Sequence, residues 1–242
     1  MAILRTIVWF LYFFLSLVVI LPPMYRAKHL KKQGDEAGAR RIIDKYVHWW
    51  MKSLMKLAGC KVELKGLENI PEDRAVVFMP NHQGNYDVLI TMVYLGAPPA
   101  MVAKIETKKI PMVRTWMELL DCIFIDREDP RQAIGAIRSA GEVLEKGHNI
   151  VAFPEGTRSR GDHMNPFKTG VFKIPFHAGA PIVPVVIDGS YKIMEANHNL
   201  MRPGTVKLTV LPAIETKGMD RAAQKELPHI IEEMIAKEKG NC

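Results

Sequence analysis

The chain has 242 residues, of which 48% are apolar and 24% are charged, and its formal net charge is +7. This composition excludes a disordered chain and fits one large globular domain better than two. The positive charge favours an anionic partner, but it does not choose among nucleic acid, an acidic membrane surface and an acidic or phosphorylated substrate. The cysteines Cys60, Cys122 and Cys242 form no CxxC pattern, so they indicate neither a disulfide framework nor a zinc site.

The N-terminal segment is apolar and aromatic from residue 7 to residue 21, with Ser16 as its only polar interruption. With its flanks it approaches the length of about 20 residues that crosses a bilayer. No small-residue cleavage site follows, so a retained anchor is predicted rather than a signal peptide. Basic residues come next, and they predict that the following domain lies on the cytoplasmic face of the membrane. They are Arg26, Lys28, Lys31, Lys32, Arg40 and Arg41.

A second helix is predicted over residues 42–57, where apolar and polar positions alternate at helical spacing. Its stripe includes Trp49 and Trp50, which suit either the bilayer interface or a protein core. We therefore assign residues 1–57 to N-terminal membrane-anchoring helices and residues 58–242 to a separate domain.

The rest of the chain alternates between strand-like and helix-like runs, which is typical of an α/β fold. Predicted strands cover residues 61–64, 75–79, 100–102, 122–125, 150–153, 182–187 and 206–210. Predicted helices cover residues 86–95, 112–119, 130–145, 169–177 and 220–239. The sequence lacks the glycine-rich patterns of dinucleotide-binding and P-loop proteins and the GxSxG of serine hydrolases.

The first candidate site is the segment NHQGNYD at residues 81–87, between a predicted strand and a predicted helix. His82 and Asp87 are five residues apart, so their side chains can meet only if His82 precedes the helix. Asn85 is the predicted N-cap, which places Asp87 in the first helical turn. Asp87 would then bind Nδ1 of His82 and leave Nε2 free as a general base. The alternative is a histidine in a capped turn beside an ordinary first-turn acid.

The second candidate site is the segment FPEGTRS at residues 153–159, which follows another predicted strand. It combines a glycine that allows close backbone approach with hydroxyls and a guanidinium that suit a phosphate. A surface ion pair between Glu155 and Arg158 is the alternative. Lys104 and Arg127 end two further predicted strands, and they would converge on the edge with His82 if these strands are neighbours in one sheet.

Four blocks of the sequence resemble those of the glycerolipid acyltransferases, in the order that this family has them. They are the NHx4D segment at residues 81–87, residues 123–127, FPEGTRS at residues 153–159 and residues 182–186. Chain length and the apolar N-terminus are similar to those of the bacterial 1-acylglycerol-3-phosphate acyltransferases. One departure is Asp121, where the family usually has a glycine six residues before the arginine of its second block.

The resemblance implies a single mixed sheet flanked by helices, and transfer of an acyl chain from acyl-CoA or acyl carrier protein to the 2-hydroxyl of lysophosphatidic acid. The product would be phosphatidic acid, a precursor in phospholipid biosynthesis. His82 and Asp87 would be catalytic, with no covalent enzyme intermediate, no metal and no cofactor beyond the acyl co-substrate. The implied phosphate-binding residues are Lys104, Arg127, Glu155, Gly156, Thr157 and Arg158.

Other functions stay open at this point. Within the same class, the acceptor could be glycerol 3-phosphate or a lysophospholipid with a headgroup. A metal-dependent phosphoesterase could use His82, Asp87 and Glu155 as ligands, and a non-catalytic lipid-binding protein would use the anchor and the phosphate loop. Nucleic acid is not an expected partner, because the basic residues are dispersed and no binding motif accompanies them.

Overall fold

The computed structural model describes residues 1–126 and 130–240 of the chain. Its centre is one sheet with the strand order β1-β7-β6-β2-β5-β3-β4. Neighbouring strands are parallel, except that β6 and β7 are antiparallel, so the predicted single mixed sheet is confirmed. The strands are β1 (Cys60–Lys65), β2 (Val77–Pro80), β3 (Ala100–Lys104), β4 (Ile123–Ile125), β5 (Ile150–Val151), β6 (Ile182–Asp188) and β7 (Gly204–Val210).

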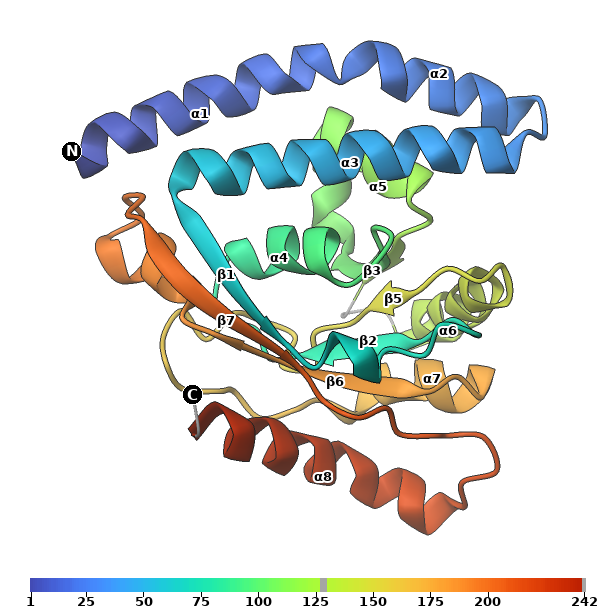
Figure 1. The fold of residues 1–242 in the computed structure, drawn as a ribbon. Coiled ribbons are helices and arrows are strands. Elements are labelled where there is room, and N and C mark those ends of the chain that lie inside the picture. The colour runs from blue at the N-terminus through green and yellow to red at the C-terminus, as the bar shows by residue number, and fades with distance from the viewer. Residues whose placement is uncertain (127–129, 241–242) are drawn as a thin grey trace.

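Helices cover both faces of this sheet (Figure 1). They are α1 (Ala2–Val19), α2 (Leu21–Lys32), α3 (Glu36–Ala58), α4 (Tyr86–Tyr94), α5 (Pro111–Leu119), α6 (Pro130–Glu145), α7 (Lys173–Ala178) and α8 (Arg221–Gly240). The first three stack on one side, with α4 between α3 and the sheet, whereas α8 lies across the other face. The described part of the chain thus forms a three-layer sandwich that carries the N-terminal helices on top.

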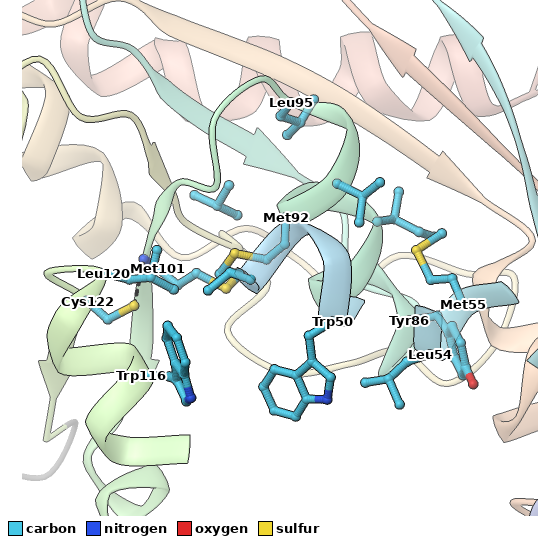
Figure 2. Packing of buried hydrophobic residues seen from close by; sticks show 14 of the residues in the cluster. Trp50, Leu54, Met55, Tyr86, Met92, Leu95, Met101, Trp116, Leu120 and Cys122 are labelled. Atoms are coloured by element: carbon cyan, nitrogen blue, oxygen red, sulfur yellow. Dashed lines mark hydrogen bonds between the residues drawn. The ribbon is translucent and has the colours of Figure 1, made fainter. Parts of the chain in front are cut away.

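The central strand β2 shows how the sheet separates two apolar cores. Its side chains alternate, because successive residues of a strand point to opposite faces. Phe78 belongs to the core beneath the N-terminal helices, and Val77 and Met79 belong to the core beneath α6, α7 and α8. Figure 2 shows the first core, where Trp50 of α3 lies near Met92 of α4. Both faces of β2 are therefore buried, which is typical of a central parallel strand.

The first helix, α1, packs on α3 along one narrow face. The indole nitrogen of Trp9 donates to the carbonyl of Leu54 at 3.0 Å, and that of Trp50 donates to Oγ of Ser16 at 2.8 Å. Only 17% of α1 is buried, and its mean hydropathy is 2.2, so by length and composition it is able to cross a membrane. It is the one such helix among the described residues. Trp50 is thus a core residue, whereas Trp49 is 44% exposed.

The basic segment after the anchor is helical, which the sequence reading did not predict. Pro22 and Pro23 occupy the first turn of α2, where proline is tolerated because the first amides of a helix have no intrahelical acceptor. The two prolines therefore lie at the beginning of a second helix and do not start a loop. Lys31 at the end of α2 forms a 2.7 Å ion pair with Asp121, which joins the N-terminal helices to the rest of the fold.

Asp121 itself keeps the backbone conformation that a glycine would favour. Its φ is +57°, in the left-handed region that aspartate visits more readily than most other residues. The departure from the family pattern at this position therefore retains the turn before β4. The aspartate also adds the ion pair with Lys31, which a glycine could not form.

Candidate active site

The turn between β2 and α4 lies at the carboxyl end of a central strand, where open α/β sheets commonly bind ligands. Asn81 anchors it to the end of β6, since its side-chain amide donates to the carbonyl of Ile187 at 2.8 Å and its oxygen accepts from the Ile187 amide at 2.7 Å. Gln83 Oε1 accepts from the Gly189 amide at 2.9 Å. Two buried side chains thus hold His82 between them against the sheet.

His82 and Asp87 meet as the spacing predicted. Nδ1 of His82 lies 2.8 Å from Oδ2 of Asp87, and the two side chains are 15% and 0% exposed. The imidazole stacks on the ring of Phe153 with 4.0 Å between centroids, which restricts its rotation. A carboxylate can only accept here, so Nδ1 carries the proton of this hydrogen bond and Nε2 is left as the basic nitrogen of the neutral ring.

The cap of α4 differs from the prediction in one respect. Asn85 occupies the N-cap position, but its side chain forms no capping hydrogen bond. Asp87 in the first turn reaches back instead, because its Oδ2 accepts from the amide of Gly84, which precedes the helix, at 2.8 Å, and it also contacts Nδ1 of His82. The side chain of Asn85 instead accepts from Arg158. The hydrogen bond from the Gly84 amide holds the carboxylate that orients the imidazole.

Glu155 braces the same turn from the loop after β5. Its Oε1 accepts from the His82 amide at 2.6 Å, its Oε2 accepts from the Asn165 amide at 2.7 Å, and the residue is only 1% exposed. Burial raises the pKa of this carboxyl, and the hydrogen bonds from Asn165 and His82 oppose the shift. The alternative of a surface ion pair between Glu155 and Arg158 is not among the described contacts, because the carboxylate points inward to two backbone amides.

Backbone pairing adds to this brace. The Ser159 amide donates to the carbonyl of His82 at 2.8 Å, and the Arg160 amide donates to the carbonyl of Gln83 at 3.0 Å. Gly156 has a φ of +70°, so the bend after Glu155 uses the left-handed region that favours glycine. The FPEGTRS loop and the NHQGNYD turn are therefore one connected unit.

Arg158 faces the beginning of α4. Its Nη1 donates to the side-chain oxygen of Asn85 and lies 3.4 Å from Oε1 of Glu195. The side chain of Arg158 is 31% exposed, so part of it remains open to a ligand. Thr157, beside it in the loop, is exposed. A cation thus lies next to the turn that carries the histidine.

The other two predicted cations are less closely placed. Lys104 ends β3, which is parallel to β5 as β2 is, so it lies at the same edge of the sheet as His82. Its side chain is exposed, and within the described residues no hydrogen bond joins it to His82 or Arg158. Arg127 lies outside the residues that the structure describes. The structure therefore brings together His82, Asp87, Glu155 and Arg158.

The sequence reading missed two residues of this unit. Asn165 contributes a backbone amide to Glu155, and Glu195 contributes a carboxylate to Arg158 and to the Asn85 amide. Asn165 lies ten residues after Glu155, outside the FPEGTRS block, and Glu195 lies in a short 3-10 helix 110 residues after Asn85. No spacing rule could have indicated either, since the contacts depend on how loops fold across the sheet edge.

Replacing Glu155 by glutamine is expected to lower the free energy of unfolding by about 1–3 kcal/mol, because the new amide group must oppose one of two buried backbone donors. Urea unfolding in detergent measures the change. Glu226→Gln, an exposed substitution on α8, is the matched control. Equal stability of the two variants would contradict a bracing role for Glu155.

Metal ligation finds no support in the described ranges, 1–126 and 130–240. No group of three or more His, Cys, Asp or Glu side chains in them is arranged to hold a metal ion. Oδ2 of Asp87 contacts His82 Nδ1 and the Gly84 amide, and both oxygens of Glu155 accept from backbone amides. The described polar groups at this site are joined to one another by hydrogen bonds.

Comparisons with known proteins all indicate the same family. Residues 61–188 match the acyltransferase family. The chloroplast 1-acyl-sn-glycerol-3-phosphate acyltransferase BAT2 of Brassica napus is 31% identical over 176 residues, which are 72% of this chain and 51% of the relative. This chain therefore spans about half the length of that protein.

A bacterial relative is matched over more of its length. The 1-acyl-sn-glycerol-3-phosphate acyltransferase of Escherichia coli is 32% identical over 188 residues, with 76% of each chain covered. Among solved structures, that of the 1-acyl-sn-glycerophosphate acyltransferase from Thermotoga maritima has a TM-score of 0.82 and 25% identity, and the match covers 99% of this chain and 96% of that one. The likeness in fold thus includes the N-terminal helices.

Proposed function

The chain belongs to the acyltransferase family, and we propose that it transfers an acyl group from a thioester to the 2-hydroxyl of 1-acyl-sn-glycerol 3-phosphate, which gives phosphatidic acid. The observation that carries the proposal is the 2.8 Å contact between His82 and Asp87 on a turn that also binds Arg158 through Asn85. A base for a hydroxyl and a cation for a phosphate thus lie side by side. The names of the relatives support the same acceptor.

In this mechanism His82 is the general base. Its Nε2 takes the proton of the acceptor hydroxyl while that oxygen forms a bond to the thioester carbonyl carbon. Asp87 holds the ring through Nδ1 and stabilises the positive charge that the imidazole gains. The carbonyl re-forms as the carbon–sulfur bond breaks, and the thiolate leaves and takes up a proton from the imidazolium. No covalent enzyme intermediate is needed.

Arg158 is the central phosphate ligand in the proposal, and Gly156, Thr157, Lys104 and Arg127 are proposed to contribute to phosphate binding. A guanidinium matches two phosphate oxygens at once, and part of Arg158 is exposed. Glu155 has the different task of holding the His82 amide and the loop. Binding the phosphate beside the base turns the attack into a step between positioned groups, which is a large source of rate enhancement.

The donor in this proposal is acyl-CoA or acyl carrier protein, with no further cofactor. The enzyme works at a membrane, since α1 exposes a long apolar surface beside a catalytic turn whose substrate is a lipid. The basic residues of α2 would contact anionic headgroups on the cytoplasmic face. We keep the boundary between residues 57 and 58 as the proposed division between anchor and catalytic domain.

The function is tested by a mass-spectrometric acceptor screen of the full chain with one acyl thioester. The expected result is selective acylation of lysophosphatidate over glycerol 3-phosphate and headgroup-bearing lysophospholipids, with unchanged activity in EDTA. Preference for another acceptor would show that the protein is an acyltransferase for that acceptor instead of lysophosphatidate. Loss of activity in EDTA would favour metal-dependent chemistry, and no acylation of any acceptor would overturn the proposal.

A further inference from the structure

Glu195 is a buried carboxylate to which neither the sequence nor the proposed mechanism assigns a task. It lies in the short 3-10 turn η5 (Glu195–Asn197) that follows β6, and its side chain is only 3% exposed. Its Oε1 accepts from the Asn85 amide at 2.7 Å and lies 3.4 Å from Nη1 of Arg158. One oxygen thus contacts both the start of α4 and the guanidinium.

The fit of this carboxylate against the turn is close. A Cβ added to Gly84 would lie 2.7 Å from Oε2 of Glu195, so any larger residue at Gly84 would displace the glutamate. Oε2 itself is buried and has no hydrogen-bond partner among the described residues. An unpartnered buried carboxylate oxygen costs free energy, so its position calls for a reason other than stability.

The negative charge of Glu195 is unfavourable for phosphate binding by Arg158. A carboxylate beside the cation that binds a phosphate weakens the attraction between them. What it provides in return is a fixed direction for Arg158, whose guanidinium is held between Asn85 and Glu195 before any ligand arrives. Holding a binding group in place in advance reduces the ordering cost of binding.

We propose that Glu195 is a positioning residue that ties Arg158 to the turn carrying His82 and Asp87, and so sets the separation at which the enzyme accepts a phosphate and a hydroxyl. This inference rests on the proposed function. Its chemical consequence is selectivity for acceptors with the lysophosphatidate spacing between these two groups. A merely structural residue would affect stability and total activity without changing that selectivity.

The test compares two acceptors with full-length enzyme in detergent. One is lysophosphatidate, and the other is a homologue with one extra methylene between the hydroxyl-bearing carbon and the phosphate. Glu195→Gln keeps an oxygen for the Asn85 amide but loses the charge that holds Arg158, whereas Glu195→Ala loses both. Glu226→Ala on the exposed face of α8 is the matched control.

With Glu195→Gln we expect KM for lysophosphatidate to rise about tenfold with little change in kcat. With Glu195→Ala we expect kcat/KM for lysophosphatidate to fall about 100-fold, since misplacement on the order of 1 Å has effects of this size. The preference for lysophosphatidate over the homologue should fall about tenfold, and KM for the thioester should stay unchanged.

A double-mutant cycle with Arg158→Ala completes the test. If Glu195 acts through Arg158, adding Glu195→Ala to Arg158→Ala should cost much less than it costs in the wild type. Additive losses, or equal losses with both acceptors, would overturn the positioning role while leaving the proposed function intact. A wild-type enzyme that acylates neither acceptor would instead overturn the proposed function, and this inference with it.

Discussion

Replacing His82 by alanine is expected to lower kcat for lysophosphatidate acylation by about 10²–10⁴-fold, the usual contribution of a general base. The structure supports this size of effect because the imidazole is oriented by Asp87 and by stacking on Phe153, with Nε2 as its free basic nitrogen. KM for lysophosphatidate should change little, since phosphate binding is assigned to another loop. Steady-state kinetics with both substrates measures the effects on kcat and on KM separately.

Loss of folding must be separated from loss of the base. His82→Ala leaves the fully buried Asp87 without its side-chain partner, so a second variant is needed. In His82→Asn the side-chain amide can take the place of Nδ1–H and donate to Asp87, but it supplies no base. Both variants should lose activity, and His229→Ala on the exposed surface of α8 should not. Turnover within a few fold of wild type in His82→Asn would contradict general-base catalysis by this residue.

The positions of His82 and Asp87 could be predicted because they depend on local rules. A strand that ends at Pro80 and a helix that begins at Tyr86 leave a short turn, and a spacing of five residues across it brings the two side chains together. The edge shared by β2, β3 and β5 was likewise predictable, since parallel strands end on the same side. Local propensity and strand direction were therefore sufficient to predict which turn and which edge of the sheet form the site.

The task of Glu155 was not predictable, because it depends on which way a loop side chain points. The FPEGTRS segment suits a phosphate by composition, yet the carboxylate turns inward to two backbone amides, one of them that of His82. The role of Glu195 was not predictable for a related reason, since its partners Asn85 and Arg158 are 110 and 37 residues away in sequence. Buried polar contacts between loops are set by tertiary packing, which leaves no periodic pattern in the sequence.

At helix α2 and at the turn containing Asp121, local sequence was compatible with more than one conformation. Two adjacent prolines suggest an interruption, but they fit the first turn of a helix as well as they fit a loop. Asp121 departs from the glycine of the family pattern, yet it adopts a positive φ and joins Lys31 across the boundary between the N-terminal helices and the sheet. Residue type allowed two conformations in each place, and long-range contacts selected one.

Replacing Asp87 by alanine is expected to lower kcat by about 10²–10⁴-fold, an effect similar to loss of the base, because the imidazole loses both its orienting partner and the charge that stabilises its cation. Asp87→Asn should be milder. In the wild type, His82 Nδ1 and the Gly84 amide both contact Oδ2, while Oδ1 is buried without a described partner. An asparagine whose oxygen takes the Oδ2 position therefore keeps both hydrogen bonds.

The difference between the two variants separates orientation from charge. If orientation dominates, Asp87→Asn should retain on the order of one tenth of wild-type kcat, with a loss of stability of about 1–3 kcal/mol for the buried amide left without an acceptor. If the charge dominates, the asparagine should be nearly as inactive as the alanine. Rates near wild type in Asp87→Ala, with the fold verified by circular dichroism, would contradict the pairing itself. The shared use of one oxygen by His82 and Gly84 makes orientation the expected answer, because an asparagine oxygen in the Oδ2 position can accept from both donors without carrying a charge.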